Sequence, residues 1–154
     1  MKRTYIYALD VSMNRTGVAI FTNNENLVEC FSIDTTKEKD LRGKLVLLAN
    51  SYLKIMEKYP PSVIVMEQGF TKYNTSTQMI FRCFGITNYI FADYEQITIP
   101  SSTIKKIVTG HGNSKKEAVR DCVSKIYPEI EISNLDESDA IATGIAYFRK
   151  RGDQ

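Results

Sequence analysis

A chain of 154 residues with 43% hydrophobic and 25% charged residues has the size and composition of a single globular domain. The formal net charge of +2 favours no class of partner, and no apolar run approaches the ~20 residues of a membrane span, so we predict no membrane association. The N-terminus leads directly into a predicted strand, as expected of a cytoplasmic protein. The cysteines lie far apart, which favours reduced thiols over a zinc site or disulfides.

Hydrophobic periodicity and turn residues predict alternating strands and helices without a linker or repeat, hence one domain over residues 1–154. The strand at 4–10 is apolar on both sides and is therefore expected at the centre of the sheet. The pattern as a whole predicts an α/β fold, a mixed sheet covered by helices on both faces. The predicted elements are strands at 4–10, 18–21 and 27–33 with turns at 14–17 and 23–26, a helix at 38–58, a strand at 62–67, a helix at 75–92, a strand at 95–99, and helices at 101–108, 114–126 and 136–150.

Acidic residues stand at the ends of buried elements. Asp10 closes the strand at 4–10, and Glu67 closes the strand at 62–67. These two strands are expected to be parallel neighbours, which puts both carboxylates at the edge where α/β sheets bind ligands. A carboxylate buried there is costly unless a cation meets it.

A second pair of acids, Asp136 and Asp139, lies at i and i+3 on the first turn of the last helix. Ser133 and Asn134 are candidate caps for that turn. The small residues that follow, Ala140, Ala142, Gly144 and Ala146, allow the helix to pack closely on the sheet. Together with Asp10 and Glu67, the pair predicts a site for Mg²⁺ or Mn²⁺.

A basic segment follows the last predicted strand and surrounds a glycine-containing loop at 110–113. Lysines beside an acidic metal site favour a polyanionic substrate whose phosphates the lysines hold. The loop at 68–74 adds aromatic residues and a lysine that can stack on a base and contact its phosphate. The predicted contacts to such a polyanionic, base-carrying substrate are Phe70, Lys72, Tyr73, Lys105, Lys106, His111, Asn113, Lys115, Lys116 and Arg120.

The helix predicted at 75–92 is apolar over an arc too wide for one face against a sheet. We therefore expect a second subunit to cover part of it, in a symmetric homodimer. The predicted interface residues are Met79, Cys83, Ile86 and Ile90.

Between residue 4 and about 148, the chain resembles the RuvC family of Holliday junction resolvases. The motifs that carry the resemblance, in order, are Asp10 followed by Gly17, Glu67-Gln68-x-Phe70, Val108-Thr109-Gly110-x-Gly112 between lysines, and Asp136-x-x-Asp139-Ala140-x-Ala142. Two positions depart from the family pattern: Val11-Ser12 stand where Pro-Gly is usual, and His111 replaces an apolar residue. The composition resembles that of resolvases carried by phages of low-GC bacteria.

The resemblance implies an RNase H-like fold with a five-stranded mixed sheet, a homodimer, and crossover-junction endodeoxyribonuclease activity on four-way DNA junctions. It implies Mg²⁺, with Mn²⁺ as a substitute and two ions per active site, and products with 5′-phosphate ends. The residues that match the family's catalytic carboxylates, functional lysines and stacking phenylalanine are Asp10, Glu67, Asp136, Asp139, Lys105, Lys116 and Phe70.

Two alternatives stay open at this point. One is an RNase H-fold nuclease of the YqgF type that acts on RNA, against which the wide apolar helix and Asp139 argue. The other is a junction-binding protein without cleavage, against which the intact set of carboxylates argues.

Overall fold

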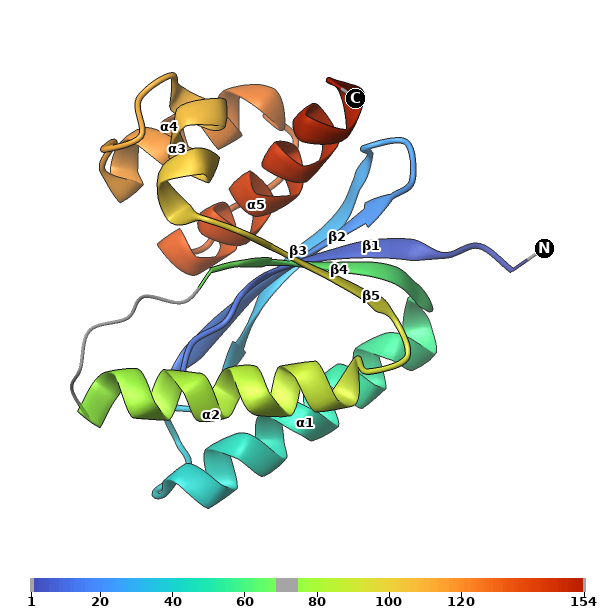
Figure 1. Ribbon diagram of the computed structural model, residues 1–154, viewed down its shortest axis with the longest axis vertical. Helices are drawn as coiled ribbons and strands as arrows, with labels where there is room; N and C mark the ends of the chain where they lie inside the picture. The colour runs from blue at the N-terminus through green and yellow to red at the C-terminus, as the bar shows by residue number, and fades with distance from the viewer. Residues whose placement is uncertain (1, 69–74, 154) are drawn as a thin grey trace.

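The structure is a computed structural model that describes residues 2–68 and 75–153, and within these ranges the chain forms one five-stranded sheet and five α-helices (Figure 1). The elements are β1 (Tyr5–Asp10), β2 (Arg15–Thr22), β3 (Leu27–Asp34), α1 (Leu41–Lys58), β4 (Pro61–Glu67), α2 (Thr75–Ile90), β5 (Glu95–Ile99), α3 (Ser101–Thr109), α4 (Lys116–Ile126) and α5 (Leu135–Gly152).

The strand order is β3-β2-β1-β4-β5, with β1 antiparallel to β2 and parallel to β4. The predictions that β1 is central and lies parallel to β4 are therefore confirmed. Because β5 is also parallel to β4, the carboxyl ends of β1, β4 and β5 share one edge of the sheet. Across the other side of β1, Asp10 pairs with Gly17 and Gly17 pairs with Ser32, so these residues form one row across three strands.

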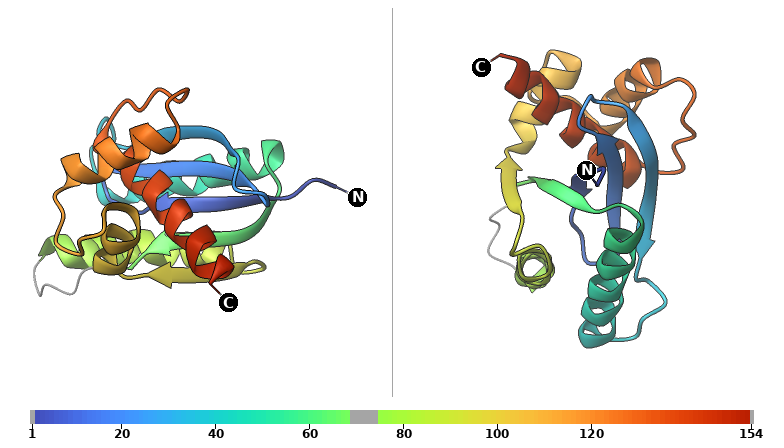
Figure 2. Two further views of the ribbon diagram at one scale, coloured as in Figure 1. Left: turned by 90° about the horizontal axis from the view of Figure 1, so that it is seen from above. Right: turned by 90° about the vertical axis from the view of Figure 1, so that its right-hand side faces the viewer.

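Alternating side chains of the strands form two cores, one on each face of the sheet. On one face Ile6 and Ala8 pack with α3, α4 and α5; on the other, Tyr7 and Leu9 pack with α1 and α2. The views in Figures 1 and 2 show the same division, with α1 and α2 on the opposite side of the sheet from α3, α4 and α5. The predicted covering of both faces by helices is confirmed.

The main error in the predicted boundaries concerns residues 14–17, which were expected to form a turn. The chain is already in strand β2 from Arg15, because its backbone pairs with β3 and its guanidinium lies 3.3 Å from the Asp34 carboxylate. Pairing along a neighbouring strand outweighs the turn preference of Asn and Gly. Helix α1 begins at Leu41 rather than at 38, because the Asp40 carboxylate caps it by accepting from the Gly43 N–H.

Helix α5 lies unusually close to the sheet. A Cβ atom added to Gly144 would stand 2.2 Å from the Phe21 ring, and one added to Gly17 would stand 2.0 Å from the Asp136 carbonyl oxygen. Ala140, Ala142 and Ala146 are fully buried along the same helix. The small residues therefore allow the close approach predicted from the sequence, and Gly17 contributes the matching space on β2.

Candidate active site

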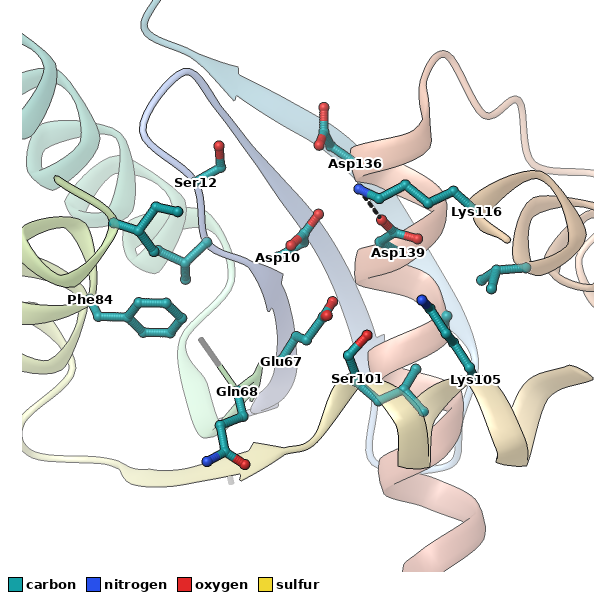
Figure 3. Close-up of a pocket in the computed structure, with 15 residues that line it drawn as sticks. Asp10, Ser12, Glu67, Gln68, Phe84, Ser101, Lys105, Lys116, Asp136 and Asp139 are labelled. Atoms are coloured by element: carbon teal, nitrogen blue, oxygen red, sulfur yellow. Dashed lines mark ion pairs between the residues drawn. The ribbon is translucent and has the colours of Figure 1, made fainter. Parts of the chain in front are cut away.

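The acidic residues from distant parts of the sequence meet in one cleft of about 350 Å³ (Figure 3). Asp10 and Glu67 reach it from the ends of β1 and β4, and Asp136 and Asp139 from the first turns of α5. Lys105 of α3 and Lys116 of α4 line the same cleft. The structure thus brings together the carboxylates and the lysines that were predicted to act together.

The first turn of α5 is fixed by a reciprocal cap. The Asn134 side chain accepts from the Glu137 N–H at 2.9 Å, and the Glu137 carboxylate accepts from the Ser133 N–H at 2.7 Å. The arrangement resembles a capping box, except that the Glu137 carboxylate reaches the N–H of Ser133, the residue before the N-cap Asn134. The predicted cap at Asn134 is confirmed, while Ser133 contributes its backbone N–H.

The environment of the cleft disfavours negative charge. Burial raises the pKa of Asp10 well above its ordinary value, and the charges of Glu67 and Asp139 raise it further, while Lys116 opposes them. Burial likewise raises the pKa of Glu67, against the effect of a hydrogen bond from the Ser101 hydroxyl. The cleft therefore favours the uptake of positive charge.

Lys116 supplies part of that charge. Its Nζ lies 3.1 Å from Oδ2 of Asp139, which is 11% exposed, whereas the lysine side chain is 56% exposed. Burial alone would lower the pKa of Lys116, but the charge and the hydrogen bond of Asp139, together with the charges of Asp10 and Asp136, outweigh burial and the pKa is raised. Burial still raises the pKa of Asp139 despite this ion pair. One lysine therefore does not neutralise the acidic cluster.

The donors of the cleft fit a hard divalent cation, because Asp10, Glu67, Asp136 and Asp139 offer carboxylate oxygens from rigid strand and helix ends. Among residues 2–68 and 75–153, no three His, Cys, Asp or Glu side chains stand close enough together to share one ion. Burial, and after it the charges of Glu67 and Asp139, raise the pKa of Asp10, so a bound cation would stabilise the ionised form of these acids.

The remaining predicted DNA contacts lie outside the lining of the cleft. They are exposed side chains on α3, on α4 and on the loop that joins them, namely Lys106, His111, Asn113, Lys115 and Arg120. Phe70, Lys72 and Tyr73 lie outside the described residues.

Sequence reasoning missed several residues that line the cleft, among them Ser12, Phe84 and Ser101. Ser101 directly follows Pro100, after the end of β5, and Glu67 pairs with Ile99 of that strand. The signal available for Ser101 was its position just after a predicted strand, since a residue that follows a strand parallel to β4 lies at the same edge as one that ends β4.

The predicted interface on α2 needs a correction. Cys83 is 1% exposed and packs into the protomer's own core with Tyr7 and Phe91, so it does not reach a second subunit. Part of the wide apolar arc is used within the chain, because Phe84 and Ile90 pack against the same core and Ile80 lines the cleft. The large apolar side chains that remain exposed on the described part of α2 are Phe81 and Tyr89.

The sheet order, together with carboxylates at the ends of β1 and β4 and on α5, defines an RNase H-like protein whose acidic cleft suits phosphodiester cleavage. The profile of a family described as crossover junction endodeoxyribonuclease RuvC matches residues 6–147, and the chain belongs to this family.

Relatives and solved structures agree with this assignment. The chain is 29% identical to a RuvC of Ehrlichia ruminantium over 93% of this chain and 95% of that protein, and 24% identical to one of Rickettsia typhi over 89% and 92%. The structure of Thermus thermophilus RuvC in complex with a Holliday junction substrate matches with a TM-score of 0.81 at 13% identity, over 97% of this chain and 96% of that one. The predicted phage origin stays a prediction.

Proposed function

We propose that this protein is a metal-dependent, structure-selective DNA endonuclease that resolves Holliday junctions, and other branched DNA, by paired nicks. The observation that carries the proposal is the convergence of Asp10, Glu67, Asp136 and Asp139 with Lys105 and Lys116 in one cleft. The chain's membership of the RuvC family supports the same reaction. Its proposed place of action is the cytoplasm, as predicted from the sequence. Among the described residues, no helix combines the length and hydrophobicity needed to cross a membrane.

Asp10, Glu67, Asp136 and Asp139 are proposed to hold two Mg²⁺ ions, which Mn²⁺ can replace. The chemistry that such ions supply when bound is the activation of water and the stabilisation of the leaving 3′ oxygen, which leaves a 5′-phosphate. The chain's contribution is to hold the carboxylates on rigid elements and partly away from water, where electrostatic interactions are strong.

Lys116 and Lys105 are proposed to hold the phosphate that is cut. The raised pKa keeps Lys116 charged, and its half-exposed ammonium reaches from α4 to Asp139 at the acidic cluster. Lys105 lines the same cleft from α3 (Figure 3). The positive charge of these two lysines beside the acids offsets the acids' repulsion of the DNA backbone.

DNA beyond the cleft is proposed to follow the exposed basic surface of α3, α4 and their connecting loop. The proposed contacts there are Lys106, His111, Asn113, Lys115 and Arg120, all exposed. Phe70 is proposed to stack on a base, with Lys72 and Tyr73 beside it.

A homodimer is proposed to place two such clefts on one junction. Support comes from α2, where Phe81 is 47% and Tyr89 is 77% exposed. Gly85 lies between them, one helical turn from each, and a Cβ added there would meet nothing within 4 Å. This leaves room for a second helix to approach between the aromatic rings. Of the residues first predicted, Met79, Ile86 and Ile90 are half-buried and are proposed to border the contact.

The direct test is to incubate the purified protein with labelled four-way, three-way and linear DNA, and with structured RNA, in Mg²⁺, Mn²⁺, Ca²⁺ or EDTA. We expect paired, ligatable nicks in the four-way junction in Mg²⁺, none in EDTA, and no cutting of linear duplex. Equal cutting of structured RNA would favour the YqgF-type alternative. Tight junction binding without cutting in Mg²⁺ or Mn²⁺ would favour a binding protein and overturn the proposal.

A further inference from the structure

Glu137 is a buried acidic residue to which the proposed chemistry gives no part. It lies between Asp136 and Asp139 in the sequence, yet it is 6% exposed and does not line the cleft. A buried carboxylate is costly unless hydrogen bonds satisfy it. The hydrogen-bond partners of the Glu137 carboxylate therefore indicate its role.

The Glu137 carboxylate connects the start of α5 to strand β3. One oxygen accepts from the Ser133 N–H at 2.7 Å, and the other lies 3.4 Å from the Ser32 hydroxyl and 3.5 Å from the Asn134 amide nitrogen. The Asn134 amide also donates to the Ser32 hydroxyl at 2.8 Å. A capping box needs only residues of its own helix. The link to Ser32 goes beyond capping and fixes the helix to the sheet.

Ser32 belongs to the row of residues that crosses the sheet below α5. It pairs with Gly17, and Gly17 pairs with Asp10 of the acidic cluster. Gly17 also lies directly against the carbonyl of Asp136, because an added Cβ would stand 2.0 Å from that oxygen. The first turn of α5 is therefore bonded to Ser32 and closely approaches Gly17, two neighbouring points of the row that ends in Asp10.

We propose that Glu137 is a positioning residue that, with Ser32 and Asn134, fixes the height and rotation of α5 and so sets Asp136 and Asp139 relative to Asp10. The proposal rests on the proposed function in one respect, that these aspartates bind the cations. Groups that orient metal ligands typically change metal affinity about 10–100-fold when they are removed.

The test compares Glu137→Ala, Glu137→Gln and Ser32→Ala with the wild type. The matched control is Asp40→Ala, which removes the cap of α1, where the Asp40 carboxylate accepts from the Gly43 N–H at 2.7 Å on the other face of the sheet. Mn²⁺ affinity of the free protein is measured by electron paramagnetic resonance. The Mg²⁺ dependence of junction cutting, junction binding in Ca²⁺ and the Tm are measured in parallel.

We expect Glu137→Ala to bind Mn²⁺ at least about tenfold more weakly and to need correspondingly more Mg²⁺ for cutting, with high Mg²⁺ restoring the rate. Ser32→Ala also weakens Mn²⁺ binding and raises the Mg²⁺ concentration needed for cutting, by a smaller factor. Glu137→Gln restores most of the affinity, because its amide oxygen still accepts from the Ser133 N–H and its amide nitrogen can donate to the Ser32 hydroxyl. Asp40→Ala lowers the Tm and leaves the Mn²⁺ affinity unchanged.

The proposal is overturned if Glu137→Ala or Ser32→Ala lowers the Tm as Asp40→Ala does while Mn²⁺ affinity stays at the wild-type value, because Glu137 then only stabilises the fold. If Glu137→Ala does not fold, Ser32→Ala decides, since it removes a single hydroxyl. A wild-type protein that neither binds Mn²⁺ nor cuts junctions refutes the proposed function instead.

Discussion

At Asp10, the demands of stability and of the proposed chemistry oppose each other, because the ionised carboxylate that would bind a cation is disfavoured in the folded protein. Burial, Glu67 and Asp139 all raise its pKa, and Lys116 opposes them only in part. Such a group disfavours the folded state when it is ionised and is retained for what it binds. Substitutions at single charged residues should therefore separate activity from stability.

Asp10→Asn should reduce junction cutting by far more than about tenfold, because it removes a proposed cation ligand. Junction binding should stay intact or strengthen, since one negative charge near the DNA is lost. In EDTA at neutral pH the Tm should rise, because the amide ends the repulsion with Glu67 and Asp139. Cutting in Mg²⁺ above about a tenth of the wild-type rate would remove Asp10 from the active site.

Lys105→Ala and Lys116→Ala should slow cutting and make junction binding less sensitive to salt, because each removes one contact to phosphate. The slope of log affinity against log salt concentration, from titrations at several salt concentrations, is the measurement. Lys54→Ala is the control, since Lys54 is exposed on α1 across the sheet. A slope for Lys105→Ala and Lys116→Ala equal to that of the control would place both lysines outside the DNA path.

Among the elements, α5 combines structural and chemical roles. Its small residues let it approach the sheet, and its first turn carries two of the proposed ligands together with Glu137. Its distance from the sheet therefore affects both the core and the cleft.

Gly144→Ala should destabilise the fold by about 1–3 kcal/mol, as overpacking of a filled core does. The added Cβ meets the Phe21 ring, which already packs edge-on against Tyr127 and Phe148 and has little room to move. Gly152→Ala on the same helix is the control, because a Cβ there meets nothing within 4 Å. Urea unfolding of both variants measures the difference, and equal stability would show that α5 shifts at little cost.

The sequence predicted this architecture well because its strongest signals are local. Asp10 and Glu67 end apolar runs, so their place at one edge of the sheet followed from the strand order. The burial of Cys83 and the link from Glu137 to Ser32 could not be predicted, because both depend on side chains far apart in the chain. Periodicity gives the faces of a helix, but it does not tell which face meets solvent and which meets a neighbouring element.

At the scale of the whole molecule, the acidic cleft makes stability depend on pH and on divalent cations. The pKa values of Asp10, Glu67 and Asp139 are raised in the folded state above ordinary values of 3.8, 4.5 and 3.8. Between these ordinary values and the raised ones, the folded state binds more protons than the unfolded state. The contribution of these groups to stability is therefore full at low pH and is lost as the pH rises through the raised values.

In EDTA, the Tm of Asp10→Asn relative to the wild type should increase as the pH rises from about 4 toward neutrality, because the variant lacks one of these groups. Saturating Mg²⁺ should raise the Tm of the wild type at neutral pH more than that of the variant. Thermal melts across pH with and without Mg²⁺ provide the measurement. A constant difference in Tm across this range would contradict the raised pKa of Asp10.

Tyr89→Glu and Phe81→Glu should weaken the proposed dimer, because each places a charge on the exposed face of α2. We expect these variants to stay folded. Light scattering should show that they are monomers, and junction assays should show single nicks in place of paired ones. Val28→Glu on β3 is the control, as Val28 is 39% exposed away from α2. A wild type that stays monomeric at micromolar concentration, with and without junction DNA, would contradict the dimer.

The position of α5 after all other described elements has a consequence for synthesis on the ribosome. Asp10 and Glu67 emerge early, but Asp136 and Asp139 follow only after the whole sheet has been made. The same helix supplies Ala140, Ile141 and Ile145 to cover one face of that sheet. A nascent chain therefore lacks half of its acidic cluster until the helix that completes the core has docked. If Asp136 and Asp139 are the cation ligands proposed above, the chain gains the ability to cut DNA only after α5 has docked.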